Sequence, residues 1–342
     1  MKAPHSVCSE PCLSGYRKAT ILGQPICCFD CVQCSMGEIT NVTGTSECMR
    51  CPEHLWSDDK REKCIAKTTD FLAFEDSLGL SLTIASIAAS YITVSVLGIF
   101  VKFHDTPIVR ANNQEVSYIV LVSLTLCFLC SLIFIGRPMK INCLVRQTAF
   151  GVIFSVCISS VLAKTVTVII AFNATKPSSK LKRWVGSRWI PCYIVSFSSL
   201  LQIIICVIWL CTAAPFPQHN MKSETGKIII ECHEGSTIMF YCMLGYLGFL
   251  ASTCFIVAFF ARNLPDRFNE AKHITFSMLV FISVWLSFIP AYLSTKGKNM
   301  VAVEVFAILS SSVALLVCIF IPKCYIILLK PYKNTREKLT GK

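Results

Sequence analysis

Seven long apolar runs constrain this chain of 342 residues more than any other feature of its sequence. Each run reaches or exceeds the roughly 20 residues that a helix needs to cross the hydrocarbon core of a bilayer. The runs are Leu78–Val101, Val116–Ile135, Thr148–Phe172, Ile190–Ala214, Thr237–Phe260, Ile274–Leu293 and Val301–Leu329. The sequence therefore predicts a mainly α-helical membrane protein in which residues 78–329 form a bundle of seven transmembrane helices.

The basic character of the chain reflects membrane topology rather than binding of nucleic acid. Hydrophobic residues make up 54% of the sequence and charged residues 15%, with a formal net charge of +12. Residues 1–77 contribute eight Lys and Arg against eleven Asp and Glu, so the excess of positive charge belongs to the remainder. There it lies in short connections between apolar runs, and we expect no nucleic-acid partner.

The distribution of Lys and Arg over these connections predicts the orientation of the bundle. One side holds fifteen of them: Lys102, Arg110, Lys176, Lys180, Lys182, Arg183, Arg188, Arg262, Arg267, Lys272, Lys330, Lys333, Arg336, Lys338 and Lys342. The other side holds fewer, among them Arg137, Lys140, Lys222, Lys227, Lys296 and Lys298. Because short basic loops stay in the cytoplasm, we expect a multi-pass protein of the plasma membrane with an extracellular N-terminus and a cytoplasmic tail at 330–342.

A small cysteine-rich domain is expected over residues 1–70, with a linker at 71–77. Nine of the 21 cysteines fall there: Cys8, Cys12, Cys27, Cys28, Cys31, Cys34, Cys48, Cys51 and Cys64. A polar segment of this size needs disulfides or a metal to hold its fold. Nine is an odd number, so one cysteine has a partner elsewhere or remains a free thiol.

Two interpretations of these cysteines are open. Cys31-x2-Cys34 and Cys48-x2-Cys51 have the spacing of zinc ligands. The sequon at Asn41 favours disulfides instead, because glycosylation and disulfide formation both occur on the luminal side of the membrane. A sequon that occurs by chance is the alternative to glycosylation at Asn41.

Two further cysteines face the extracellular side in the predicted topology. Cys143 lies at the outer end of the third span and Cys232 in the outer loop before the fifth. A disulfide between them would tie that loop over the mouth of the bundle. The alternative is a pair of free thiols.

Ionisable residues within spans are the first candidates for function, since each costs ~2.5–3.5 kcal/mol at the centre of a membrane helix. Lys164 and Glu270 both fall near the inner face, at the ends of the third and sixth spans. A contact between them would hold these spans together, and its loss would free the sixth span to move. A lysine that extends to the lipid headgroups by itself is the alternative. Glu304, near the outer face, could be merely interfacial.

The sixth span also contains Trp285 and Pro290. The proline removes a backbone hydrogen bond and bends the helix. The tryptophan could respond to the contents of the bundle, or it could simply fill the core or face lipid. The sequence contains no catalytic motif such as His-Glu-x-x-His or Gly-x-Ser-x-Gly, so we expect no enzyme activity, no metal and no cofactor.

Several stretches together resemble class C (family 3) G-protein-coupled receptors. They are SVCSEPCLSGYRKATILGQPICCFDC, TPIVRANNQE, LPDRFNEAKHITFSM, FIPAYLSTKGKNMVAVEVFAIL and IPKCYIILLKP. The resemblance covers nearly all of residues 5–334. It is strongest for the calcium-sensing branch, and within that branch for the type-2 vomeronasal (pheromone) receptors.

The resemblance implies roles for individual residues. The disulfides would be Cys8–Cys28, Cys12–Cys31, Cys34–Cys48 and Cys51–Cys64, with Cys27 bonded to a large bilobed ligand-binding domain. Lys164 and Glu270 match the ionic contact of the family at the inner face. The residues that would contact a G protein are Leu264, Arg267, Phe268 and Asn269 in the third inner loop, and Lys180, Lys182 and Arg183 in the second. The presence of each of these lysines is explained equally well by membrane orientation alone, because short cytoplasmic loops are rich in Lys and Arg.

The chain also departs from the family pattern. The bilobed domain is absent, and Met1–Pro4 is followed at once by His5 and Cys8 with no signal peptide between. We therefore expect a truncated chain, which either begins at an internal methionine or represents a short isoform.

The resemblance implies a chemosensory receptor that acts on a heterotrimeric G protein and forms homo- or heterodimers. One alternative is a non-signalling isoform that modulates full-length receptors. A transporter is the other, although the two halves show no repeat and the midplane is nearly free of charge.

Overall fold

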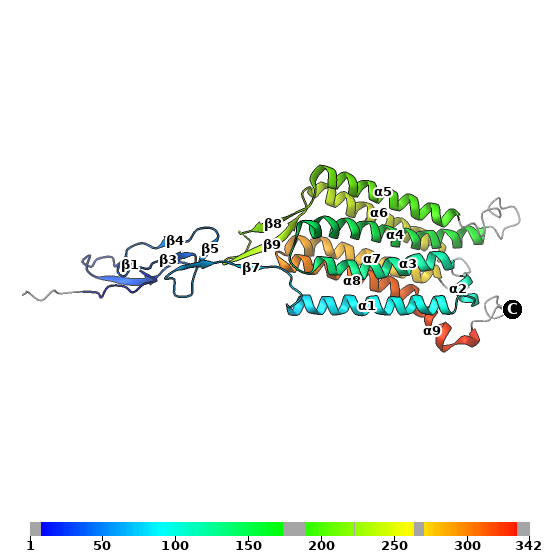
Figure 1. The fold of residues 1–342 in the computed structure, drawn as a ribbon, viewed down its shortest axis with the longest axis horizontal. Coiled ribbons are helices and arrows are strands. Elements are labelled where there is room, and N and C mark those ends of the chain that lie inside the picture. The colour runs from blue at the N-terminus through cyan, green and yellow to red at the C-terminus, as the bar shows by residue number, and fades with distance from the viewer. Residues whose placement is uncertain (1–7, 112, 174–188, 222, 263–269, 334–342) are drawn as a thin grey trace, which may run out of the picture. The chain divides into compact units, whose positions relative to one another are not determined.

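The computed structural model describes residues 8–111, 113–173, 189–221, 223–262 and 270–333, and divides the chain into two compact units (Figure 1). The cysteine-rich unit comprises Met1–Phe71 together with His219–Glu231. The helical unit comprises Leu72–Gln218 and Cys232–Lys342.

The cysteine-rich unit consists of short antiparallel strand pairs. The pairs are β1 (Tyr16–Thr20) with β2 (Phe29–Gln33), β3 (Glu38–Ile39) with β4 (Met49–Arg50), and β5 (Leu55–Ser57) with β6 (Cys64–Ala66). A further strand, β7 (Thr68–Asp70), runs parallel to β9 (Lys227–His233), which also pairs with β8 (Phe216–Asn220). Strands this short bury little apolar surface, so they need covalent support.

Four disulfides provide that support. They join Cys8 to Cys28, Cys12 to Cys31, Cys34 to Cys48 and Cys51 to Cys64, the same pairs that the resemblance implied. The two CxxC pairs are thus distributed over three different bonds. The zinc interpretation does not hold in this structure, because a zinc ligand must be a thiolate and these sulfurs are bonded to one another.

Residues 219–231, which the sequence places in a loop between the fourth and fifth spans, complete the cysteine-rich unit. The Trp56 ring packs against Gly37 and Gly226, and a Cβ at either glycine would meet it at 3.0–3.3 Å. Gly37 also has a φ of +84°, which few other residues adopt. Strand pairing and an ion pair of 3.9 Å between Lys227 Nζ and Asp70 Oδ2 join the same segment to β7.

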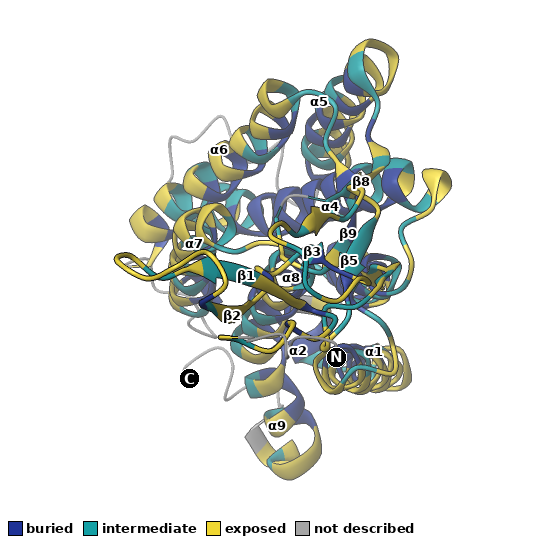
Figure 2. Ribbon diagram, turned by 90° about the vertical axis from the view of Figure 1, so that its left-hand side faces the viewer, coloured by how far each residue is buried: buried dark blue, intermediate teal, exposed yellow. Residues whose placement is uncertain are grey.

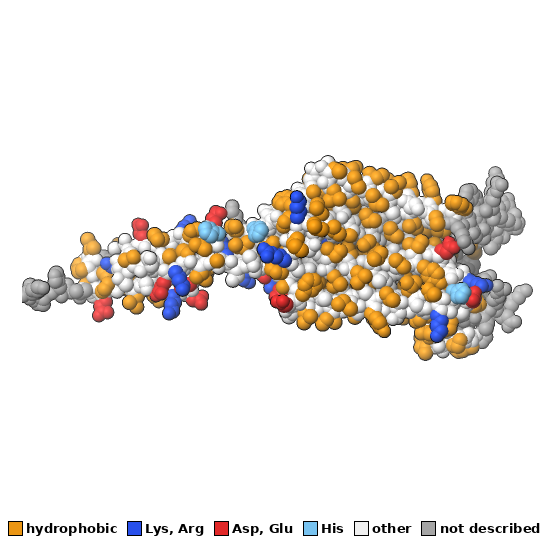
Figure 3. Space-filling view, in the orientation of Figure 1, with side chains coloured by type: hydrophobic (Ala, Val, Ile, Leu, Met, Phe, Trp, Pro, Cys, Tyr) orange, Lys and Arg blue, Asp and Glu red, His pale blue; other side chains and the backbone are white. Residues whose placement is uncertain are grey.

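The helical unit confirms the seven predicted spans. Among the described residues, seven helical segments are long and apolar enough to cross a membrane: α1 (Ser77–Lys102), α3 (Gln114–Ser131, extended by a 3-10 turn at Leu132–Phe134), α4 (Lys140–Asn173), α5 (Trp189–Ala213), α6 (Thr237–Ala261), α7 (Glu270–Ser294), and α8 (Lys298–Ile319) with α9 (Ile321–Leu329). A short helix, α2 (Pro107–Ala111), precedes α3, and a 3-10 turn at Pro331–Lys333 follows α9. On the face of the bundle seen in Figure 3, hydrophobic side chains cover the long sides of the helices and charged ones gather toward the ends.

Two of the predicted runs differ in detail from the helices of the structure. Helix α4 begins at Lys140 rather than Thr148, because its first turns bury polar side chains instead of facing lipid. The seventh span is two helices rather than one, since Pro322 lacks the N–H that would continue α8 and instead occupies the first turn of α9.

The core of the bundle is built around α3, α4 and α8. In each of these three spans, more than half of the apolar segment that would cross the membrane is buried inside the bundle. In α1, α5, α6 and α7 the buried share of that segment is about a third or less. Figure 2 shows the same contrast, with exposed colour on the outward sides of α1, α5 and α6. Helix α4 packs against α3, α5 and α6.

Several buried hydroxyl side chains inside the helices form hydrogen bonds with one another or with the backbone. Ser86 and Thr93 donate to the carbonyls of Leu82 and Ala89 one turn earlier, and the Ser86 and Ser131 hydroxyls lie 2.8 Å apart across α1 and α3. Such pairing lowers the cost of burying a hydroxyl group away from water.

A fifth disulfide, Cys143–Cys232, joins the first turn of α4 to the end of β9 across a sequence separation of 89 residues. We call the end of the bundle that carries this bond the disulfide end, and the other the opposite end. In the chain-entropy description a loop of this length contributes about 4–5 kcal/mol of stabilisation.

The first turn of α1 generates a prediction with a control in the same helix. A Cβ at Gly79 would overlap the carbonyl oxygen of Ala73, whereas one at Gly98 would meet nothing within 4 Å. We expect Gly79→Ala to lower the midpoint of thermal unfolding in detergent, at a cost of about 1–3 kcal/mol. Gly98→Ala should leave it unchanged or raise it slightly, because alanine favours helix by up to about 1 kcal/mol. Equal midpoints for the two variants would contradict this packing.

Candidate functional site

The first buried polar cluster of the helical unit lies at the opposite end and is centred on Glu270, in the first turn of α7. Glu270 Oε1 accepts hydrogen bonds from Lys323 Nζ at 2.7 Å and from Lys164 Nζ at 3.5 Å. Lys164 Nζ also donates to Ser117 Oγ at 2.7 Å. These four residues, which we call the ionic cluster, connect α3, α4, α7 and α9.

The ionic cluster is buried from solvent. Lys164, Glu270 and Lys323 are each no more than 6% exposed, and both ammonium groups lie 5.6–6.0 Å from the ring centre of Phe320. The position of Glu270 at the start of α7 suits a negative charge, because the N-terminus of a helix carries partial positive charge. Two lysines therefore share one carboxylate in a site that water does not screen.

The structure thus brings Lys164 and Glu270 together and adds a lysine that the sequence analysis missed. Lys323 falls inside the last apolar run, Val301–Leu329, and was not singled out there. Its significance could have been noticed from the rule that a charge within a span needs a partner. The break between α8 and α9 falls at Phe320, and Lys323 lies in the first turn of α9.

A group of aromatic rings lies further along α7. The Trp285 ring stacks on Phe150 of α4 with centroids 5.4 Å apart and meets Phe288 edge-on at 5.2 Å. A cavity of about 320 Å³ opens beside it between α6 and α7, where Gly245 and Gly248 carry no side chain. Trp285 therefore packs in the bundle rather than facing lipid alone. Pro290, about one turn later, is exposed.

A second charged cluster lies at the disulfide end, in a region where the sequence analysis identified only Glu304. Arg146 Nη2 lies 3.6 Å from Glu234 Oε1 and 3.9 Å from Glu304 Oε2. Gln147 Nε2 donates to Glu304 Oε1 at 2.9 Å and to Glu234 Oε1 at 3.3 Å. We call these four residues the outer-loop cluster.

Burial distinguishes the outer-loop cluster from surface ion pairs. Glu304 is 4% exposed, so the interpretation of it as merely interfacial was wrong. Burial, reinforced by the negative charge of Glu304 and opposed by Arg146, raises the pKa of Glu234 to about 7. Arg146, Gln147 and Glu234 were not foreseen because they are up to 88 residues apart in sequence (234 − 146) and no pattern links them.

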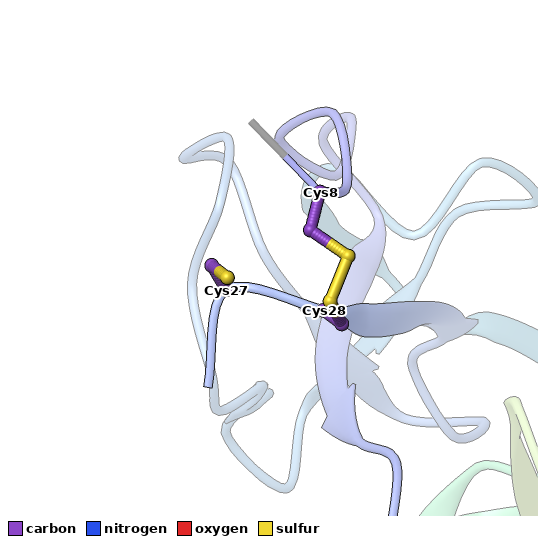
Figure 4. Close-up of side chains that lie close together, drawn as sticks. All are labelled: Cys8, Cys27 and Cys28. Atoms are coloured by element: carbon purple, nitrogen blue, oxygen red, sulfur yellow. A yellow bond between two sulfur atoms is a disulfide. The ribbon is translucent and has the colours of Figure 1, made fainter. Parts of the chain in front are cut away.

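Cys27 remains a free, exposed thiol in the described part of the chain. Its sulfur lies within 4.8 Å of those of Cys8 and Cys28, which are bonded to each other (Figure 4). Three neighbouring sulfurs do not form a metal site here, because two of them are not thiolates. That Cys27 bonds to another domain stays a prediction.

The other candidate residues are outside these clusters. Asn41 is exposed in the cysteine-rich unit, as a glycosylation site must be. The residues expected to contact a G protein lie outside the described residues: Lys180, Lys182, Arg183, Leu264, Arg267, Phe268 and Asn269.

Comparison with known proteins matches almost the whole chain. A family model described as "7 transmembrane sweet-taste receptor of 3 GCPR" matches residues 72–323, and one described as "Nine Cysteines Domain of family 3 GPCR" matches residues 3–57. The chain is 53% identical to vomeronasal type-2 receptor 26 of Mus musculus over 337 residues, which are 98% of this chain and 39% of that receptor.

Two other relatives are similar over the same extent. Vomeronasal type-2 receptor 116 of Mus musculus is 48% identical over 341 residues, 100% of this chain and 40% of that receptor. The extracellular calcium-sensing receptor of Homo sapiens is 48% identical over 338 residues, 99% of this chain and 31% of that receptor. The chain thus spans 40% or less of the length of these relatives.

The charge balance of the ionic cluster predicts an order of stability among three variants. Glu270→Gln removes the carboxylate that both buried lysines contact, so we expect the largest loss, about 3–5 kcal/mol. Lys323→Met removes the shorter contact with Glu270, of 2.7 Å, and should cost less stability than Glu270→Gln. Lys164→Met removes only the longer contact, of 3.5 Å, and should cost the least stability of the three. Thermal unfolding in detergent would measure this, with the exposed Lys102→Met as a neutral control. A loss for Glu270→Gln no greater than for Lys164→Met would refute the shared contact.

Proposed function

The chain belongs to the class C (family 3) G-protein-coupled receptors, and on that premise we propose that it transmits an extracellular signal through its helical unit to a heterotrimeric G protein. The relatives in the comparison are named as receptors rather than enzymes. The ionic cluster is the observation that supports the proposal most, because it joins α7 to α4 and α9 at one end of the bundle through a single carboxylate.

The orientation we propose puts the cysteine-rich unit outside the cell and the ionic cluster near the cytoplasm. Lys and Arg are concentrated in the connections at the opposite end. The disulfides of the N-terminal unit suit an oxidising compartment. A cytoplasmic ionic cluster would lie beside the loop before α7, where the family resemblance puts the G-protein contact.

The proposed mechanism is a change between two packings of α7. In the resting packing, Glu270 is held by both lysines. A signal that lowers the stability of this contact frees the start of α7, and the new arrangement binds a G protein. The signal can act only through a difference in its affinity for the two states.

We further propose a chemosensory role of the pheromone type, supported by the identity of 48–53% to the two vomeronasal receptors. By family resemblance the receptor would work as a homo- or heterodimer. Ligand recognition is not assigned to this chain, since it spans 40% or less of these relatives.

Basal signalling tests the mechanism. Glu270→Gln should raise agonist-independent G-protein activation most, and Lys323→Met and Lys164→Met less, at equal surface expression. Lys102→Met, which alters an exposed lysine at the end of α1, should have no effect. Exchanging the two charges, by Lys164→Glu together with Glu270→Lys, should lower the basal activity only in part. Lys323 would then lie beside a lysine at position 270 instead of a carboxylate. Unchanged basal activity in every variant would remove the ionic cluster from the mechanism.

Topology is tested separately. An N-terminal epitope tag should bind antibody on intact cells, and a C-terminal tag only after permeabilisation. Glycosidase should increase the gel mobility of the wild-type chain but not that of Asn41→Gln. The opposite accessibility of the tags would invert the orientation, and equal mobility for a chain that reaches the surface would exclude glycosylation at Asn41.

A further inference from the structure

The outer-loop cluster contains more negative than positive charge. It has two carboxylates, Glu234 and Glu304, and one guanidinium, Arg146, whose side chains are 12%, 5% and 3% exposed. Fully ionised, the cluster carries a net charge of −1 in a place that is nearly closed to water. A buried net charge is costly, and a buried carboxylate commonly avoids that cost by taking up a proton.

The groups that surround the cluster offer no second counter-ion among the described residues. Helix α4 contributes Arg146 and Gln147, α8 contributes Glu304, and α7 and α6 contribute only the phenols of Tyr292 and Tyr241. From α5, Trp209 Nε1 donates to the backbone oxygen of Glu234 at 3.0 Å. The adjacent His233 is exposed, and its Nδ1 accepts a hydrogen bond from the Gly235 N–H.

The backbone of this loop is fixed, so a change of charge at Glu234 acts on its contacts and not on its position. Cys232, two residues earlier, is bonded to Cys143. Gly235 has a φ of +67°, and a Cβ there would overlap the carbonyl oxygen of Ala213. Glu234 therefore stays beside Arg146 in either protonation state.

We propose that Glu234 is a proton-binding site through which the pH of the solution at the disulfide end controls how Arg146 of α4 is shared between this loop and Glu304 of α8. Of the three charged side chains, that of Glu234 is the most exposed, which gives it the readiest access to solvent. Its Oε2 is buried and accepts no hydrogen bond from the described residues, so a proton on this oxygen displaces no existing contact.

Proton uptake changes the distribution of ion pairs. With Glu234 ionised, it competes with Glu304 for the single guanidinium of Arg146. When a proton passes from solvent to the Glu234 carboxylate, the net charge of the cluster rises from −1 to zero. Arg146 is then the counter-ion of Glu304 alone, which strengthens the connection between α4 and α8. This site is distinct from the ionic cluster, and the inference does not depend on the proposed function.

The raised pKa of Glu234 supports the same conclusion and fixes the sign of the pH dependence. Its ordinary value is 4.5, and the folded value is about 7. Between these values the folded chain binds a proton that the unfolded chain has released. Stability therefore decreases as pH rises from about 4.5 to about 7 and is level above that range.

The test uses the full chain in lipid nanodiscs, with the midpoint of thermal unfolding measured between acidic and mildly alkaline pH. In the wild type we expect the midpoint to fall as pH rises toward neutrality. Glu234→Gln should abolish most of this fall, while Glu231→Gln, a matched change three residues earlier in the same loop, should preserve it. An equal fall in Glu234→Gln and in the wild type would overturn the proposal.

A spectroscopic measurement and a second variant keep the test decisive if Glu234→Gln folds poorly. Infrared difference spectra between acidic and alkaline pH should show the carbonyl stretch of a protonated carboxylic acid in the wild type and in Glu231→Gln. Glu304→Gln removes the neighbouring negative charge, so it should move the titration toward acid by about one pH unit. A titration that Glu304→Gln leaves in place, or a carboxylic acid signal that survives in Glu234→Gln, would show that another group binds the proton.

Discussion

One buried carboxylate, Glu270, determines how the helices are held together at the opposite end of the bundle. It is the acid of the ionic cluster, and the two lysines that contact it come from α4 and from α9. In lipid none of these charges can be left alone, since an unpaired ion in the bilayer core costs several kcal/mol. The start of α7 is therefore fixed by a contact that is strong when complete and costly when any member is lost.

At the disulfide end, too, a single charged side chain holds two side chains of opposite charge, but the signs are reversed. There one cation, Arg146, serves two carboxylates, whereas at the opposite end one carboxylate serves two cations. Helix α4 takes part in both clusters, since Arg146 and Lys164 are 18 residues apart (164 − 146), which is about 27 Å along a helix. Phe150 and Phe154, between them, pack against Trp285 of α7. The most buried helix of the bundle thus connects both charged clusters and the aromatic group.

The sequence predicted what depends on local pattern and missed what depends on distant partners. Apolar length alone predicted seven spans, because the bilayer leaves few other possibilities. It could not predict that α4 begins early, since Arg146 and Gln147 look like loop residues until Glu234 and Glu304 are seen to lie beside them. Lys323 was overlooked for the same reason. The four disulfides of the cysteine-rich unit were implied by family resemblance rather than by spacing, and nothing in the sequence indicated that residues 219–231 would join that unit.

The central claim is that Glu270 restrains α7 and that signalling releases it. The most direct measurement is the distance between spectroscopic labels incorporated at Ala171, near the end of α4, and at Lys272, in the first turn of α7, both of which are exposed. The account predicts a single distance for the wild type in lipid, and a second, longer distance that appears with Glu270→Gln and again when a G protein is bound. A distribution that neither the substitution nor the G protein alters would contradict it.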